Sequence, residues 1–149
     1  MAVTVQEADF SLADEISKLT SSNTDIGGIA SFVGTVRAQN DGQTLTALTL
    51  EQYPGMTEQE LAKIETQARD RWPLLGVTII HRYGRLVPGD NIVLVIATSS
   101  HRQAAFDACQ FIMDYLKTDA PFWKSEELAD GSIHWVETRA SDNTAKQRW

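Results

Sequence analysis

The sequence predicts a single α+β domain with a mainly antiparallel or mixed sheet and helices packed on it. Predicted strands occur as adjacent pairs separated by helices, unlike the strict alternation of a doubly wound parallel sheet. The 149 residues are 42% hydrophobic and 22% charged, values typical of one globular domain. Neither an internal repeat nor a proline-rich linker divides the chain, so we expect one domain over residues 1–149.

The first third of the chain predicts strand, helix and strand. Val3–Gln6 alternates in polarity, which is typical of a short strand, and residues 11–21 carry apolar side chains at helical spacing. The apolar stretch Ile26–Val36 predicts a strand, in which Gly27, Gly28 and Gly34 permit close approach of another backbone. An Asp-Gly turn follows, and Thr44–Tyr53 is the returning strand.

The middle of the chain predicts a helix over Thr57–Trp72, beginning with a capping box between Thr57 and Glu60. Strands are expected over Gly76–Leu86 and Asn91–Ser100, and the second is a continuous apolar run typical of a strand buried on both faces. A long helix over His101–Lys117 comes next.

The last part of the chain predicts one strand and a tail. Ala120 to Trp123 form a stiff apolar turn in this interpretation, because Pro121 excludes helix at Ala120. A final strand is expected over Ser132–Thr138. Residues 139–149 have little apolar content, so we expect a flexible C-terminal tail that orders on contact with a partner.

Bulk composition excludes several function classes. The net charge is −7, which argues against a general nucleic-acid binder because such proteins need a basic face. Cys109 is the single cysteine, so no internal disulfide forms, and its place on the apolar side of a helix predicts an inert thiol. His81 and His134 lack metal-ligand spacing. No signal peptide or apolar span is evident, so a cytoplasmic location is expected.

Two groups of cations are candidates for chemistry. His101 and Arg102 stand at a predicted helix N-terminus, where the helix dipole disfavours cations and attracts anions. A bound phosphate or carboxylate would offset that cost; alternatively, Ser99 or Ser100 caps the helix and both cations point into water. Arg37 ends an apolar strand and has the fork geometry for an anion, although a solvated arginine explains it as well.

Lys117 and Lys124 form the second group and flank the apolar turn. If both face one cavity, each disfavours protonation of the other, and burial beside aromatic rings lowers a lysine pKa towards that of a general base or nucleophile. The alternative is two exposed lysines near carboxylates, with Lys117 stabilised by the dipole at the helix C-terminus.

Six separated motifs resemble the large, catalytic subunit of molybdopterin synthase and occur in family order from about residue 27 onwards. The strongest are "SSHRQAAF" (Ser99–Phe106) and "DYLKTDAPFWKSE" (Asp114–Glu126). The others are "FVGTVR", "LTLEQYPGMTE", "RWP" and "IHRYGRLVPGD". The first 25 residues match the family poorly.

The resemblance implies a domain of the α/β-hammerhead type that acts as a sulfur transferase subunit. The family converts cyclic pyranopterin monophosphate to molybdopterin, in molybdenum cofactor biosynthesis, by adding two sulfurs as a dithiolene. Each sulfur arrives as a thiocarboxylate on the C-terminal Gly-Gly tail of a small ubiquitin-like carrier subunit. The resemblance further implies a homodimer within a heterotetramer, no bound cofactor or metal, and no nucleic-acid or membrane partner.

The resemblance also assigns roles to residues. Lys117 and Lys124 match the family's two functional lysines, and Lys117 is expected nearest the carrier's terminal glycine. Arg37, His101 and Arg102 match the pocket for the substrate phosphate. The remaining residues expected in the pocket are Thr35, Val36, Ser125, Glu126, Phe32, Met113 and Arg139, the last of these acting across the dimer. Thr35 is a departure, because the family often has lysine there. The apolar turn Pro121–Trp123 is expected to wall the groove for the carrier's tail.

Two other functions stay open at this level. The same cationic pocket would suit a non-catalytic module that binds an anion or a pterin for regulation. It would also suit an enzyme acting on a phosphate ester with His101 as the base.

Overall fold

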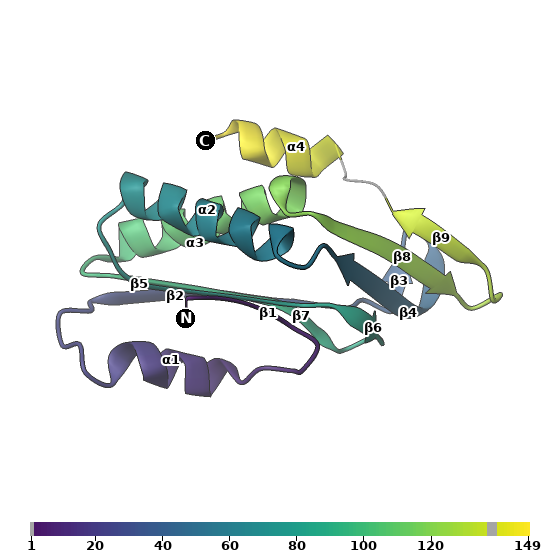
Figure 1. Ribbon diagram of the computed structural model, residues 1–149, viewed down its shortest axis with the longest axis horizontal. Coiled ribbons are helices and arrows are strands. Elements are labelled where there is room, and N and C mark those ends of the chain that lie inside the picture. Colours follow the sequence, from purple (N-terminus) through teal and green to yellow (C-terminus); the bar gives the residue numbers. More distant parts are fainter. Residues whose placement is uncertain (1, 137–139) are drawn as a thin grey trace.

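A four-stranded sheet with helices on both faces forms the body of the protein, and a second sheet extends from one end (Figure 1). The computed structural model describes residues 2–136 and 140–149. Strands of the first sheet lie in the order β1 (Val3–Gln6), β5 (Leu74–Arg82), β7 (Asn91–Ser99) and β2 (Gly28–Thr35). β1 and β5 are parallel and the other pairs are antiparallel, which confirms the predicted mixed α+β architecture.

Strand β7 is the centre of the first sheet, as its continuous apolar sequence predicts. It lies between β5 and β2, and Leu94, Val95 and Ile96 have no exposed surface. Both faces of β7 are covered, because α1 (Leu12–Thr20) packs on one face while α2 (Met56–Arg71) and α3 (Arg102–Asp119) cover the other (Figure 1). The main core therefore lies between the sheet and the pair α2 and α3.

The second sheet contains two strands that sequence analysis missed, at residues 39–40 and 122–128. Its order is β3 (Gln39–Asn40), β4 (Gln43–Gln52), β8 (Phe122–Leu128) and β9 (Ile133–Val136), with β6 (Gly84–Leu86) also paired to β4. The predicted turn from Ala120 to Trp123 is wrong beyond Pro121, since β8 begins at Phe122 and pairs with both β4 and β9. This pairing places the aromatic and lysine residues of the segment on a strand with fixed side-chain directions.

Two boundaries also differ from the sequence prediction. The strand expected over residues 76–86 is divided, because Gly84 has φ of 94° and turns the chain from the first sheet into the second. The predicted capping box at the start of α2 uses the wrong residues. Glu58 accepts a hydrogen bond from Gly55 N at 2.7 Å, while the buried Thr57 hydroxyl accepts from Tyr53 N and donates to Pro121 O.

The C-terminal segment forms a helix, α4 (Ala140–Gln147), packed on α3 (Figure 1). Lys146 Nζ lies 2.6 Å from Asp119 Oδ1, and the indole of Trp149 donates to Asp114 Oδ2 at 2.7 Å. The segment therefore contacts its own domain, and its flexibility stays a prediction. Among the residues that the structure describes, we find no helix with the length and apolar character needed to cross a membrane.

Candidate active site

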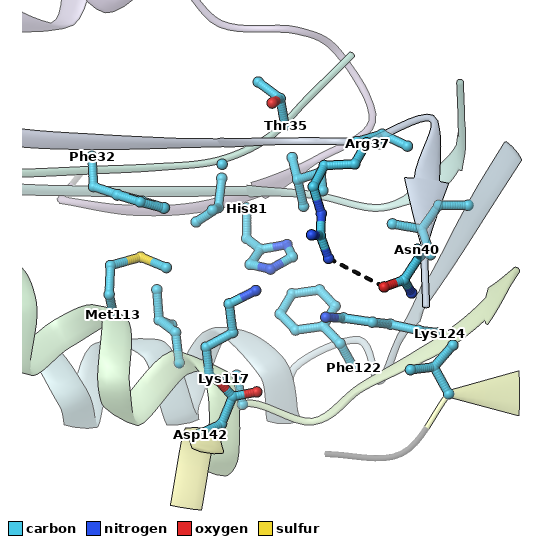
Figure 2. A pocket seen from close by; sticks show the side chains of 18 of the residues that line it. Phe32, Thr35, Arg37, Asn40, His81, Met113, Lys117, Phe122, Lys124 and Asp142 are labelled. Carbon is cyan, nitrogen blue, oxygen red and sulfur yellow. Dashed lines mark hydrogen bonds between the residues drawn. The ribbon is translucent and has the colours of Figure 1, made fainter. Parts of the chain in front are cut away.

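A cavity of about 540 Å³ lies where the two sheets meet the end of α3 (Figure 2). This volume is within the range of sites for small organic ligands. Its walls come from the end of β2 and the chain after it, from β5, from the last turns of α3, and from β8. The cavity thus depends on segments that are far apart in the sequence.

Lys117 and Lys124 reach this cavity from different elements (Figure 2). Lys117 lies in the last turn of α3, which runs towards the second sheet. Lys124 lies on β8, where side chains alternate between faces, so Phe122 and Glu126 line the cavity together with it. The two amines therefore share one site, as the sequence-based hypothesis requires.

Arg37 is held in the cavity by a short polar relay. Its Nη2 donates to Asn40 Oδ1 at 3.2 Å (Figure 2). Asn40 Nδ2 in turn lies 3.1 and 3.0 Å from the two carboxylate oxygens of Glu126. Because Asn40 is on β3 and Glu126 is on β8, this relay ties the arginine to the second sheet. A fixed guanidinium is pre-organised for a phosphate or carboxylate.

His81 also lines the cavity, although sequence analysis did not select it as a site residue. It lies at the end of β5 with 8% of its surface exposed, and its ring stacks on Phe122 with centroids 3.8 Å apart. Burial, opposed by a hydrogen bond to the Arg82 carbonyl and assisted by the charges of Lys124 and Lys117, lowers the pKa of His81 to about 3. The imidazole is therefore neutral at physiological pH.

Of the twelve predicted pocket residues, eight line the cavity and three do not. The twelfth is not described by the structure. Those lining the cavity are Phe32, Thr35, Val36, Arg37, Met113, Lys117, Lys124 and Glu126. Ser125 does not line it, because its side chain alternates to the opposite face of β8. Arg139 lies outside the described residues.

His101 and Arg102 lie at the start of α3, at the opposite end of the helix from Lys117. Sixteen residues of α-helix separate positions 101 and 117, which corresponds to about 24 Å. Both side chains are exposed and do not line the cavity. One chain alone therefore does not bring all five predicted cations together.

The start of α3 nevertheless has features suited to an anion. The N-cap residue is His101, and it makes no side-chain capping hydrogen bond, so the alternative in which Ser99 or Ser100 caps the helix is wrong. Ser99 instead donates to Pro73 O at 2.9 Å. The predicted close backbone approach is confirmed here, because a Cβ at Gly27 would lie 2.0 Å from Ser100 O and one at Gly28 would lie 3.0 Å from Arg102 Cα.

His81, Asn40 and Asp142 are among the cavity residues that sequence analysis did not select. A polar residue at the inner end of an apolar strand is the signal that would have pointed to His81. The other two lie in segments read as a loop and a tail, where polar residues carry no information. Cys109 is buried, and burial raises the pKa of its thiol to about 11, which agrees with an unreactive core residue.

The chemistry available here is that of amines, a guanidinium and a neutral imidazole. Within residues 2–136 and 140–149, no three His, Cys, Asp or Glu side chains lie close enough to hold a metal ion. Lysine side chains can transfer protons or stabilise an oxyanion, and Arg37 can bind a phosphate. The fold and the cavity thus define a class: an α+β domain with a cationic pocket whose size and charge suit an anionic small molecule.

Comparison with known proteins identifies the family. A family profile described as MoaE protein matches residues 5–119. The molybdopterin synthase catalytic subunit of Pseudomonas aeruginosa is 55% identical over 149 residues, which are 100% of this chain and 99% of that protein. The chain belongs to the MoaE family.

Solved structures agree with this assignment. A molybdopterin biosynthesis MoaE protein from Burkholderia ambifaria superposes with a TM-score of 0.84 at 49% identity, covering 100% of this chain and 98% of that one. A complex of subunits 1 and 2 of the molybdopterin-converting factor from Helicobacter pylori has the same fold, with a TM-score of 0.75 at 17% identity over 93% of this chain and 92% of that one.

Proposed function

We propose that this protein is the catalytic subunit of a molybdopterin synthase. It converts cyclic pyranopterin monophosphate to molybdopterin with sulfur from the thiocarboxylate of a small carrier subunit. The observation that carries the proposal is the convergence of Arg37, Lys117 and Lys124 on one cavity in a chain of net charge −7. Family membership supports it, since the relative at 55% identity is a molybdopterin synthase catalytic subunit.

The cavity suits the charges of the proposed reactants. The substrate carries a phosphate and the carrier ends in a thiocarboxylate, so both bring negative charge to a site that presents cations. Charge-assisted hydrogen bonds from arginine and lysine are the strongest that a protein offers to such groups. A metal or bound cofactor has no part in the proposal, because sulfur transfer from a thiocarboxylate needs neither a redox change nor an external electron.

The lysines act on the sulfur-transfer step. The thiocarboxylate sulfur forms a bond to a side-chain carbon of the pterin while a carbon–oxygen bond at that carbon breaks, and the departing oxygen takes up a proton or stays on the phosphate. Water then adds to the carrier's carbonyl carbon. The carbon–sulfur bond to the carrier breaks, the carrier leaves with a carboxylate, and the sulfur stays on the pterin as a thiolate. Lys117 and Lys124 transfer protons at the pterin side chain and stabilise the oxyanion formed at the carbonyl carbon.

The carrier is a small subunit whose flexible tail reaches the cavity. Support comes from the term "catalytic subunit" in the relative's name and from the two-subunit complex of the Helicobacter pylori factor. Phe122 lines the cavity as a wall of the predicted groove, whereas Trp123 is 52% exposed on the other side of β8, edge-on to Tyr53. A tail ending in glycines fits a narrow entrance through backbone contacts.

A second copy of the chain completes the anion site in this proposal. β2 is an edge strand of the described sheet, and Phe32 and Phe106 are exposed on the side of that edge covered by α3. The start of β2 contacts Arg102, and its end leads to Arg37. A two-fold axis near the middle of β2 would place the start of one copy's strand beside the end of its partner's, bringing His101 and Arg102 towards the partner's cavity.

Reconstitution tests the proposal directly. The purified protein is incubated with thiocarboxylated carrier and cyclic pyranopterin monophosphate, and molybdopterin is measured together with the carboxylate form of the carrier. We expect two carriers to be consumed for each molybdopterin formed. Tight pterin binding without sulfur incorporation would instead assign a binding module, and release of inorganic phosphate would assign a phosphate-ester enzyme.

A further inference from the structure

The interior end of β5 places an imidazole among the cations of the cavity. The ring of His81 lines the cavity, with Lys117 and Lys124 extending towards it from α3 and β8 (Figure 2). Only 8% of the surface of His81 is exposed to solvent. Burial of a titratable ring costs free energy unless its polar atoms have partners, so the orientation of this ring is informative.

The tautomer of His81 follows from its main-chain contact. Nδ1 lies 2.8 Å from the carbonyl oxygen of Arg82, and a carbonyl can only accept a hydrogen bond. Nδ1 therefore carries the proton, which leaves a lone pair on Nε2 at the outer end of the ring. In the residues that the structure describes, no hydrogen bond to Nε2 is formed. Phe122, stacked at 3.8 Å and 20°, holds the plane of the ring.

The charge state of His81 is also fixed by its surroundings. Lys117, Lys124 and Arg37 face the ring from three segments, with Glu126 and Asp142 as the carboxylates of the same cavity. Adding a proton to a desolvated ring beside these cations is unfavourable, so the imidazole stays neutral. Nε2 consequently remains an acceptor at physiological pH.

We propose that His81 Nε2 is a specificity-determining acceptor for an N–H or O–H group of the ligand. The cations recognise only acceptors of the ligand, so its donors depend on the imidazole and on the carboxylates of Glu126 and Asp142. Glu126 already accepts from Asn40. A pterin ring has N–H and amino donors as well as an attached phosphate, so it can satisfy the cations and the imidazole together. A plain anion such as inorganic phosphate can satisfy only the cations. This inference rests on the proposed function, because it assigns the pterin part of that substrate to His81.

Two substitutions separate the acceptor from the rest of the ring. His81→Asn keeps an amide near Nδ1 for the Arg82 carbonyl but has no atom at the Nε2 position, while His81→Gln can place an amide oxygen there. His134→Asn is the matched control, because His134 is exposed on β9 and does not line the cavity. Each variant is titrated by calorimetry with cyclic pyranopterin monophosphate and separately with inorganic phosphate.

We expect His81→Asn to weaken pterin binding by about tenfold, the usual effect of leaving one ligand donor without its acceptor. Phosphate affinity should change less than twofold, which also shows that the variant is folded, and His81→Gln should recover part of the pterin affinity. Equal pterin affinities for wild type and His81→Asn would overturn the assignment.

Nitrogen NMR of the wild-type protein provides a test that needs no substitution. Free protein should show His81 with Nδ1 protonated and Nε2 bare, and pterin should move the Nε2 resonance while inorganic phosphate leaves it in place. An Nε2 resonance unmoved by bound pterin would overturn the inference while leaving the proposed function intact. Failure of wild-type protein to bind pterin at all would overturn both.

Discussion

Cations of the proposed site lie at both ends of α3, but the two ends differ in their surroundings. At the C-terminal end, Lys117 lies in a cavity enclosed by β8 and the end of β2. At the N-terminal end, His101 and Arg102 are exposed beside the free edge of the first sheet. Local helix electrostatics explains Lys117 fully and leaves the other two cations unexplained.

A lysine whose position is already explained by the helix dipole can therefore still have a functional role. Lys117 satisfies the helix dipole and still faces Lys124 across a cavity, because the second sheet is folded against that end of the helix. The unfavourable cations at the other end have no ligand contact within one chain. They gain a role only if a second copy supplies the missing half of the site.

The largest expected effect concerns the enclosed end of α3. Lys117→Ala should reduce molybdopterin formation by about a thousandfold or more, since it removes both a proton-transfer group and a charge next to the reacting carbonyl. Turnover in the reconstituted reaction measures this, with thermal unfolding as the check that the fold is kept. Lys18→Ala on α1, whose side chain is 70% exposed, is the control. Wild-type turnover in Lys117→Ala would remove this lysine from the mechanism.

A smaller effect is expected at the anion-binding side of the cavity. Arg37→Ala removes charged hydrogen bonds, so KM for the cyclic pterin should rise about 10- to 100-fold with a smaller change in kcat. Steady-state kinetics with saturating carrier separates the two constants. Arg69→Ala on α2, where the arginine pairs with Glu65, should leave both unchanged. An unchanged KM in Arg37→Ala would contradict a phosphate-binding role.

Mixing two inactive variants tests whether residues at the two ends of α3 act together in a site shared across the dimer. Lys117→Ala and Arg102→Ala each damage every site of a homodimer, but a mixed dimer that shares residues across its interface regains one intact site. Random mixing of subunits makes half of the dimers mixed, so about a quarter of wild-type activity should return. Co-expression followed by the reconstituted assay measures the recovery. Absence of recovery, with mixed dimers demonstrated by mass spectrometry, would contradict a site shared across the dimer.

The smallest effect is on stability and arises from His81. Its pKa is lowered to about 3 in the folded protein, from an ordinary value of 6.5. Between these values the unfolded chain binds a proton that the folded chain does not, so the free energy of unfolding falls as the pH falls. The slope approaches about 1.4 kcal/mol per pH unit. Urea unfolding from about pH 6 to pH 4.5 should show this slope in wild type and not in His81→Asn, and parallel curves would contradict the burial argument.

Part of the fold can be predicted from the sequence, because buried helix and strand faces produce a regular spacing of apolar residues along the chain. The apolar run in β7 and the apolar face of α3 both predict their elements, and Leu94 and Ile112 are fully buried as expected. β8 cannot be predicted from such a spacing. Its inward side chains Phe122, Lys124 and Glu126 face a polar cavity, so the alternation of polar and apolar residues that identifies most strands is missing.

The residues of the candidate site likewise fall into those that the sequence indicates and those that only the structure reveals. Motifs in the sequence locate Arg37, Lys117 and Lys124, since a family pattern keeps residue types at fixed spacing. The motif "IHRYGRLVPGD" contains His81 but does not indicate its role, which depends on the Arg82 carbonyl, the Phe122 ring and the two lysine charges around it. A neighbour in space has no signature in a single sequence.

The sequence by itself determined which segments are apolar enough to form the central sheet and its helices, and which family the chain resembles. Tertiary structure decided that a segment read as a turn is a strand, that two lysines and an arginine meet, and that a histidine between them stays neutral. The physical reason is that hydrophobic burial is encoded locally as a repeat along the chain. Electrostatics and desolvation, by contrast, depend on distances between groups that only folding brings together.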